Sequence, residues 1–437
     1  MVKIDKKKFS VKPFPHFDPR IPLNEKVWKR LHNRSYISSH SFYPFIHYKK
    51  ITRKYSKKNK RLSEPKIRNI YYASHMDGYI YKYYGEKLNE KYSQYCLDHN
   101  IDNVSLAYRN NKKGKSNIHF AAEVIEFISK QEEAFIFITD FTKYFDNLDH
   151  DLLKKRLLNV LNIKTKKLPS DWWKVFKSLT RFSWVDKKEI IDDLKTIKNK
   201  KNGKIDRYYT PPEFRAFRKR VKINKHEQPF GIPQGTAISA VLANVYAIKL
   251  DQELNEYASK YGGLYRRYSD DIILVFPIKK GRIVQRQHIS YIISTVTRNK
   301  VQMGDEKTKT LYSRNGEIYE DANCEVRGKL DYLGFCFDGT NVMIREKSLY
   351  KYYHRMYKKI KAVKIAEYNS NRKIGRRKLY LLYSHLGRKY KGYGNFITYA
   401  EKAHRIFGRS ERINSLINRQ IKRHWKKIYN RLNQPGI

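Results

Sequence analysis

Apolar and polar positions along the chain fall into blocks that predict individual helices and strands. Residues 118–130 (IHFAAEVIEFISK) place apolar side chains three or four positions apart, which is the spacing of an amphipathic helix. Residues 134–139 (AFIFIT) form a continuous apolar run and predict a buried strand. A second helical pattern follows from Asp149 to Leu161. This order places Asp140 at the end of a buried strand.

A second group of predicted elements lies near the middle of the chain. Residues 229–235 (PFGIPQG) form a turn cluster of proline and glycine, and residues 237–261 predict one long helix. Residues 264–276 (LYRRYSDDIILVF) predict two strands around a tight turn at Ser269-Asp270. This turn presents an acidic pair beside strongly apolar strands.

The remaining pattern suggests how the chain is divided. Residues 1–63 are basic and contain several prolines, which predicts an N-terminal arm with little regular structure. Residues 186–228 are polar and rich in lysine, which predicts a surface insertion. Residues 331–345 predict a hairpin. Residues 346–437 are helical in pattern and densely basic.

The charge balance indicates the kind of partner. The 437 residues include 93 Lys+Arg and 42 Asp+Glu, so the formal net charge is 93 − 42 = +51. Such an excess repels itself in a compact state unless a polyanion neutralises it, and nucleic acid is the expected polyanion. The 36 Tyr and 21 Phe add rings that stack on unpaired bases. A ribosomal or histone-like protein would share the charge but would not need so large a core.

The cysteines and the hydropathy limit the class further. Cys96, Cys324 and Cys336 lack C-x-x-C spacing, so the sequence predicts neither a zinc site nor a disulfide framework. No N-terminal apolar run resembles a signal peptide, and no run of about 18 apolar residues predicts a membrane span. We therefore expect a cytoplasmic protein that binds no membrane.

The acidic residues at the two strand ends have the chemistry of a two-metal site. Phosphoryl transfer from a nucleoside triphosphate needs two divalent cations, one at the attacking hydroxyl and one at the triphosphate. Mg²⁺ prefers carboxylate oxygens. Asp140 ends one predicted strand, and Asp270 and Asp271 lie at the turn of a predicted hairpin, so we predict that the three are catalytic and bind two Mg²⁺ ions. The alternative is a solvated turn at the acidic pair and a helix cap at Asp140.

Three strings in these segments resemble consecutive palm motifs of reverse transcriptases. They are FITDFTKYFDNLDH, PFGIPQGTAISAVLANVY and RYSDDIILVF, in the family's order and spacing, and the last matches its YxDD signature. The resemblance covers about residues 64–345 and implies an RNA-directed DNA polymerase with an α+β, right-hand fold. The implied regions are a basic arm (1–63), fingers (64–133), a palm with an antiparallel sheet (134–345, with the insertion 186–228 and a primer-grip hairpin at 331–345) and a basic helical thumb that binds RNA (346–437).

The resemblance also implies which nucleotides are used. Phe145 stands five positions after Asp140, where a bulky ring would exclude a 2′-hydroxyl and select deoxynucleotides. Gln234 and Gly235 stand where family members pack the template base against the incoming nucleotide, and glycine lets the backbone approach closely. Viral RNA polymerases resemble this palm but usually carry a GDD turn. The alternative for Phe145 is an ordinary core ring.

Basic residues near these motifs are candidates for binding the triphosphate. PKIRNIY and AYRNNKKGKS resemble the fingers motifs of the family, and they point to Lys66, Arg68 and Arg109, because arginine grips phosphate with two donors. VQMGDEKTK resembles the motif after the catalytic hairpin. It implies that Lys307 lies near the leaving pyrophosphate and donates a proton, with Lys309 as a rival.

The finer resemblance is to bacterial defence-associated and abortive-infection reverse transcriptases, which are retron-like in size and layout. The insertion 186–228 and the string AYRNNKKGKSNIHFA carry it, and nothing resembles an RNase H domain or an endonuclease zinc site. It implies antiphage defence with a structured noncoding RNA as template, together with a primer, a DNA product and deoxynucleoside triphosphates. Two alternatives stay open: an inactive RNA-binding scaffold, and a template-independent or protein-primed DNA polymerase. An oligomer or a partner protein is also left open.

Overall fold

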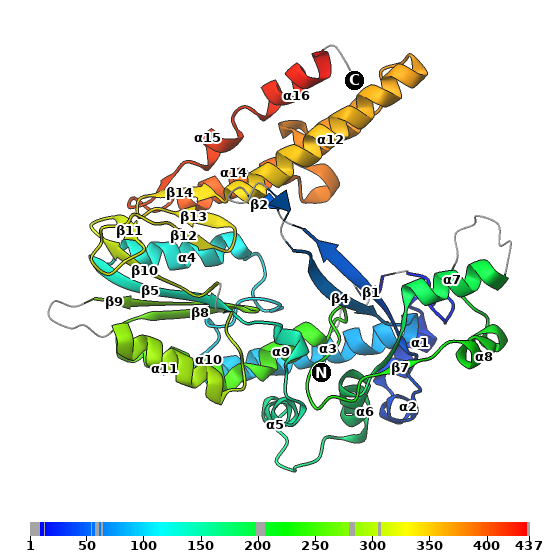
Figure 1. Cartoon of the computed structure of the whole chain (residues 1–437). Helices are drawn as coiled ribbons and strands as arrows, with labels where there is room; N and C mark the ends of the chain where they lie inside the picture. The colour runs from blue at the N-terminus through cyan, green and yellow to red at the C-terminus, as the bar shows by residue number, and fades with distance from the viewer. Residues whose placement is uncertain are drawn as a thin grey trace.

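The computed structural model describes most of the chain (Figure 1). The described residues are 9–12, 14–53, 55–56, 61–62, 64–197, 206–278, 285–304 and 307–434.

A five-stranded antiparallel sheet lies at the centre, in the order β11-β10-β5-β9-β8. Its strands are β5 (Glu133–Asp140), β8 (Leu264–Tyr268), β9 (Asp271–Pro277), β10 (Lys309–Arg314) and β11 (Glu317–Tyr319). Both faces of the sheet are covered, which explains why the central strands are apolar without interruption. Phe135 and Phe137 belong to the core beneath α10 (Ile248–Lys260) and α11 (Gln285–Arg298). Ile136 points the other way, into the core beneath α4 (Asn117–Ser129).

A second sheet, in the order β4-β1-β6-β7, forms the neighbouring lobe in Figure 1. Its strands are β1 (Phe45–Thr52), β4 (Lys66–Tyr72), β6 (Ser183–Asp186) and β7 (Asn224–Lys225). The long helix α3 (His75–Asp98) runs from this lobe toward the central sheet. The helices on this side and around the central sheet's lower edge are α1 (Glu25–His32), α2 (Arg34–Ser39), α5 (His150–Val160), α6 (Ser170–Thr180), α7 (Lys187–Ile197), α8 (Pro211–Arg220) and α9 (Ser239–Tyr246).

The N-terminal segment is more regular than the sequence predicted. It contains α1, α2 and β1, whereas we expected an arm with little regular structure. Asn24 and Asn33 start the two helices, because each side chain accepts a backbone N–H of the first turn. Strand β1 then pairs with β4 along its length. The prolines that suggested an irregular arm lie outside these elements. Most of residues 1–8 and 57–63 fall outside the described part.

The predicted surface insertion at 186–228 is also corrected by the structure. Its described part packs onto the second sheet and builds a separate core there. Tyr208, Tyr209, Phe214 and Phe217 are buried in this core, together with residues of the N-terminal segment and of β1. Lysines dominate the composition of the segment, so the few buried rings were hidden in the sequence pattern.

The C-terminal quarter of the chain, from β12 onward, forms a lobe above the central sheet (Figure 1). It starts with a sheet in the order β12-β13-β14-β15, which packs on the outer side of α4. The predicted hairpin is confirmed, because β13 and β14 pair antiparallel across the turn at 338–340. The elements are β12 (Leu330–Tyr332), β13 (Phe335–Phe337), β14 (Asn341–Ile344), α12 (Glu346–Ser370), α13 (Arg376–Tyr383), α14 (Phe396–Phe407), β15 (Asn414–Ser415), α15 (Ile417–Ile421) and α16 (His424–Asn433).

The structure therefore confirms the α+β class and the antiparallel central sheet. The long helix predicted over residues 237–261 is divided into α9 and α10 at Ala247. The small strands β2 (Tyr55–Ser56) and β3 (Arg61–Leu62) pair only with each other. Within the described residues, none of the helices combines the length and the apolarity that a membrane crossing requires.

Candidate active site

The three acidic residues singled out by the sequence meet at one end of the central sheet. Strands β5 and β9 are antiparallel, and their register makes Asp140 and Asp271 direct partners. Asp270 lies in the turn between β8 and β9, where Ser269 adopts a left-handed φ of 62°. The Asp270 carbonyl accepts the N–H of Phe141 at 2.9 Å. The backbone therefore places the three residues at neighbouring positions.

Asp140 has one oxygen that the protein leaves without a donor. The residue is 9% exposed, and its buried Oδ1 has no hydrogen-bond partner among the described residues. The other oxygen, Oδ2, forms an ion pair with the Lys307 ammonium. A Cβ at Gly304 would lie 2.8 Å from Oδ1, so glycine keeps the space beside this oxygen open. A buried carboxylate oxygen without a donor suits a cation.

The Asp271 carboxyl is also in an environment that disfavours its charged form. Partial desolvation and then the neighbouring Asp270 carboxylate raise the pKa of Asp271 to about 6, while Arg345 and Lys66 act in the opposite direction. Carboxylate oxygens from two strands are hard donors of the kind that divalent cations such as Mg²⁺ accept. In the described part of the chain, no three His, Cys, Asp or Glu side chains yet converge as a ready metal cluster. The residue types and their adjacency nevertheless fit such an ion.

Phe145 lies where the acidic strand end meets the PFGIPQG loop. It sits in a short 3-10 helix, Tyr144–Asp146, and its ring is half-buried. The Ile232 N–H donates to the Phe145 carbonyl at 2.9 Å, and the Gly231 N–H donates to the Leu148 carbonyl at 2.8 Å. These bonds attach the backbone around Phe145 to the PFGIPQG loop.

Gly235 joins the same loop to the second sheet. The Tyr71 N–H in β4 donates to the Gln234 carbonyl at 2.8 Å. Gly235 has a φ of +124°, and a Cβ there would lie 2.3 Å from the Tyr71 carbonyl oxygen. Only glycine allows this approach. The loop therefore fixes β4, and with it Lys66 and Arg68, relative to the carboxylates.

Lys66 and Arg68 point to the same face of β4, because side chains alternate along a strand. The charge of Lys66 lowers the pKa of the Asp271 carboxyl, though by less than desolvation and Asp270 raise it. The β1–β4 register pairs Arg68 with Lys50, so Lys50 shares that face. Sequence reasoning missed Lys50, although the strand pattern FIHYKKIT contained the signal.

Arg109 has a different setting from the phosphate-binding one expected for it. Its side chain is fully buried and forms an ion pair with Asp102 at 2.5 Å. It also donates to the Ser105 carbonyl at 3.1 Å, and its guanidinium lies 5.1 Å from the centre of the Tyr92 ring. These contacts stabilise the loop from inside, so the arginine does not present its charge at the acidic turn.

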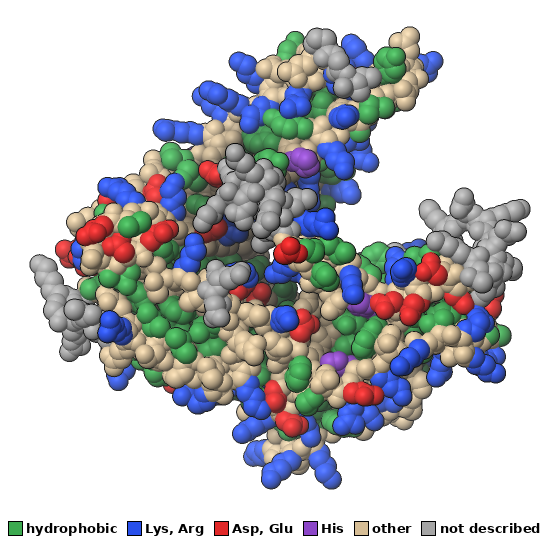
Figure 2. All heavy atoms as spheres, in the orientation of Figure 1, with side chains coloured by type: hydrophobic (Ala, Val, Ile, Leu, Met, Phe, Trp, Pro, Cys, Tyr) green, Lys and Arg blue, Asp and Glu red, His purple; other side chains and the backbone are tan. Residues whose placement is uncertain are grey.

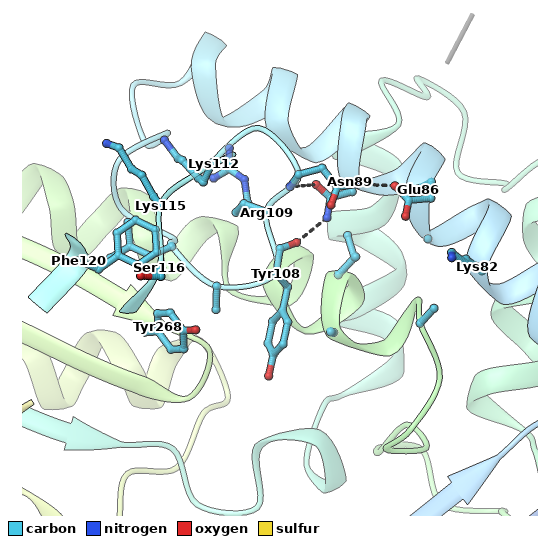
Figure 3. Close-up of a pocket in the computed structure, with 17 residues that line it drawn as sticks. Lys82, Glu86, Asn89, Tyr108, Arg109, Lys112, Lys115, Ser116, Phe120 and Tyr268 are labelled. Atoms are coloured by element: carbon cyan, nitrogen blue, oxygen red, sulfur yellow. Dashed lines mark hydrogen bonds between the residues drawn. The ribbon is translucent and has the colours of Figure 1, made fainter. Parts of the chain in front are cut away.

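A cavity of about 360 Å³ opens beside Tyr268, at the turn 268–271 that is proposed below as the catalytic turn. Figure 3 shows its wall, which consists of α3, the N-terminus of α4, the start of α9 and the pocket loop, residues 104–116. Lys112 and Lys115 lie on the loop above the rings of Phe120 and Tyr268, and the Tyr108 ring points away from α3. Cations together with aromatic rings suit an unpaired nucleic-acid strand. The motif match had indicated this loop but not its cavity.

The hairpin at 331–345 also reaches the acidic turn. Arg345 and Asp331 form an ion pair, and both charges act on the Asp271 carboxyl. The Arg345 N–H donates to the Gly334 carbonyl at 3.0 Å, at the point where α12 begins. The base of the C-terminal lobe therefore adjoins the acidic site.

Comparison with known proteins gives a family match and a set of distant structural neighbours. The family model "Reverse transcriptase (RNA-dependent DNA polymerase)" matches residues 79–337. No curated protein matches the chain.

The structural neighbours include two telomerases. Apo telomerase from Candida tropicalis is 11% identical with a TM-score of 0.42, over 72% of this chain and 52% of that one. Telomerase from Candida albicans, in complex with a TWJ fragment of telomeric RNA, is 12% identical with a TM-score of 0.41, over 92% and 61%. The chain thus spans between about half and about three-fifths of these proteins.

The contact at Gly235 gives a test of how the two sheets are joined. We expect Gly235→Ala to reduce the free energy of unfolding by about 2 kcal/mol more than Gly262→Ala does. Both glycines have a positive φ, but nothing lies within 4 Å of a Cβ at Gly262. Thermal unfolding measures the difference, and hydrogen exchange at the Tyr71 amide reports the broken bond to Gln234. Equal losses in the two variants would contradict the close approach.

Proposed function

The chain belongs to the reverse transcriptase family of RNA-directed DNA polymerases, and we propose that Asp140, Asp270 and Asp271 are its catalytic carboxylates. The observation that carries this proposal is the β5–β9 register, which makes Asp140 and Asp271 partners beside the Asp270 turn. Two divalent ions, taken to be Mg²⁺, would be held by these carboxylates, including the unpaired Oδ1 of Asp140. When bound, they supply Lewis-acid activation of the attacking hydroxyl and of the triphosphate.

The chain's own residues would position the nucleotide around this site. Lys50, Lys66 and Arg68 share one face and would bind the triphosphate through charge-assisted hydrogen bonds. Lys307, which contacts Asp140, would hold a proton near the leaving pyrophosphate. We assign Arg109 to the support of the pocket loop.

The selection of base and sugar would depend on the PFGIPQG junction. Gln234 and Gly235 would form the surface against which the template base and the incoming nucleotide pack. Phe145 would close on the sugar, and a ring without hydrogen-bond acceptors offers nothing to a 2′-hydroxyl. The backbone bonds that fix Phe145 to Ile232 support this assignment, because a gate must be rigid to discriminate.

RNA is the partner that the charge distribution favours. Residues 346–437 carry 25 Lys+Arg and 4 Glu, so their formal net charge is 25 − 4 = +21. Figure 2 shows Lys and Arg side chains gathered over the lobe that contains α12 and α16. We propose that this lobe holds the RNA template and its primer or DNA product, and that the cavity beside Tyr268 receives an unpaired part of the template.

We expect replacement of Asp270 and Asp271 by alanine to abolish Mg²⁺-dependent incorporation of deoxynucleotides on an RNA template, because the ions lose their ligands. Primer extension with labelled nucleotides measures the loss. Asp98→Ala, an exposed carboxylate at the far end of α3, is the control and should retain the parent rate. Full incorporation by the double variant would exclude these carboxylates. Binding of RNA by the parent without any incorporation would favour the inactive scaffold instead.

We expect Phe145→Ala to admit ribonucleotides, because the ring no longer fills the space of the 2′-hydroxyl. The ratio of kcat/KM for ribonucleotides to that for deoxynucleotides should rise by at least about tenfold, the range for a pocket that loses steric discrimination. Tyr144→Phe removes only the hydroxyl of the adjacent buried ring, which donates to Ala243, and should leave the ratio unchanged. An unchanged ratio in Phe145→Ala would make Phe145 an ordinary core ring.

We further propose a role in antiphage defence with a noncoding RNA as template, supported by the segment 186–228 and the string AYRNNKKGKSNIHFA. In bacteria that carry the gene in its native context, phage plating efficiency should be low with the parent protein. It should be restored when Asp270 and Asp271 are replaced by alanine. Equal plating with both proteins would contradict the defence role, and sequencing of the DNA product would identify the template and show whether the protein itself primes synthesis.

A further inference from the structure

Arg267 is fully buried directly beneath the catalytic turn, and every nitrogen of its guanidinium has a partner. Its Nε and Nη2 donate to the two oxygens of Asp251 at 2.8 and 2.7 Å. Its Nη1 donates to Asn244 Oδ1 and to the Ser269 carbonyl, both at 3.0 Å. Its Nη2 also reaches Ser105 Oγ at 3.1 Å. One side chain thus connects β8, α9, α10, the catalytic turn and the pocket loop.

The counter-charge makes this arrangement rigid. Asp251 and Arg267 both have no exposed side-chain surface, so each charge depends on the other for its stabilisation. The Tyr265 hydroxyl also donates to Asp251, at 2.9 Å, which satisfies the carboxylate further. A charge pair of this kind costs free energy to bury, and well-packed apolar residues stabilise a core at least as well. Its presence here calls for a role other than stability.

The bond to Ser269 acts on the catalytic turn itself. The Ser269 carbonyl belongs to the peptide group that leads into Asp270. Ser269 holds a left-handed φ of 62°, a conformation that a residue with a Cβ adopts only when its surroundings determine it. The bond from Arg267 orients that peptide group from below, and with it the backbone of the carboxylate pair.

The same residue determines the position of the pocket loop. The Arg267 N–H donates to the Val104 carbonyl, and the Leu106 N–H donates to the Arg267 carbonyl, both at 2.9 Å. Asn244, already bonded to Arg267, donates to the Ala107 carbonyl at 2.8 Å. The loop wall in Figure 3 is therefore attached to the network beneath the turn.

We propose that Arg267, with Asp251 as its counter-charge, is a positioning residue that holds the catalytic turn and the pocket loop in one fixed arrangement. It touches no reacting atom. Its effect is to align the carboxylates with the nucleic-acid strand that occupies the cavity. This inference rests on the proposed function for its activity measurement, but the fixed arrangement itself has a separate readout in the backbone.

Arg156 provides a matched control for the burial of an arginine. It is 5% exposed and donates to the Tyr246 carbonyl and to Asn299 Oδ1, and its guanidinium lies 5.1 Å from the centre of the Tyr246 ring. Tyr246 lies at the end of α9 and Asn299 follows α11, so neither partner belongs to the catalytic turn. Its removal should reduce stability in the way that any buried arginine would, without the effect on the catalytic turn.

The experiment compares Arg267→Lys, the double variant Arg267→Met/Asp251→Leu and Arg156→Met with the parent chain. Lysine preserves the charge opposite Asp251, but one ammonium does not reach Ser269, Asn244 and Ser105 together. The double variant replaces the pair with apolar side chains of similar size and removes the buried charge. Thermal unfolding is measured for each protein. The kcat and KM for one deoxynucleotide and the hydrogen exchange are then measured at a temperature below its unfolding range.

We expect the double variant to unfold near the parent temperature and to lose kcat by about 100-fold, the size of effect that a small misplacement of reacting groups produces. The kcat of Arg267→Lys should lie between that of the parent and that of the double variant. Amides of the catalytic turn and of the pocket loop should exchange faster together in both Arg267 variants. Arg156→Met should unfold earlier but keep the parent kcat and the parent exchange in these two segments.

A stable double variant with parent kcat and parent exchange would overturn the proposal, as would an Arg156 variant with the same loss of kcat. If the double variant fails to fold, the kcat and the hydrogen exchange of Arg267→Lys provide the test instead. If the parent itself incorporates no nucleotide, the proposed function fails, while unchanged hydrogen exchange in the Arg267 variants would still overturn the positioning role separately.

Discussion

The antiparallel register of β5 against β9 is the constraint on which the rest of the site depends. It makes Asp140 the partner of Asp271 and leaves Asp270 in the adjoining turn. Side chains alternate along a strand, so a slip of one residue would send Asp140 to the opposite face and would break both covered cores. The apolar residues between Ala134 and Ile138 hold the register, because each face of the sheet buries its own set. The stability of the core and the geometry of the carboxylates therefore have the same cause.

Close backbone approaches then assemble the other parts around this edge. Gly304 leaves room beside the Asp140 carboxylate. The backbone at Gly231 lies close to the Asp146 carbonyl, and the backbone at Gly235 lies close to the Tyr71 carbonyl of β4. At each of these positions a Cβ would meet an oxygen within 3 Å. Of the three, Gly235 makes the contact with the second sheet, because its neighbour there is the Tyr71 carbonyl oxygen of β4.

Local features were well predicted from the sequence, and features that depend on distant pairing were not. Strand ends, the turn at Ser269 and the PFGIPQG loop are determined by neighbouring residues, so their patterns were visible. Lys50 became a candidate only when β1 was seen to pair with β4. The ion pair between Arg109 and Asp102 was also absent from the prediction, because the sequence pattern does not show which acid an arginine contacts. The packing of 186–228 depends on rings in a segment whose average composition is polar.

The net charge of +51 also explains why the backbone must hold the carboxylates in defined positions. A strongly positive molecule attracts a polyanion but repels small cations, so metal ions at the proposed site would have to be held by local carboxylates against the field of the whole chain. Positive side chains also disfavour a cation at the site itself. Lys307 pairs with Asp140, and the charges of Lys66 and Arg345 act on the Asp271 carboxyl. Nucleic acid bound beside the acidic turn would screen these charges with its phosphates. Binding of the strand and binding of the ions should therefore favour each other, because each reduces the electrostatic cost of the other.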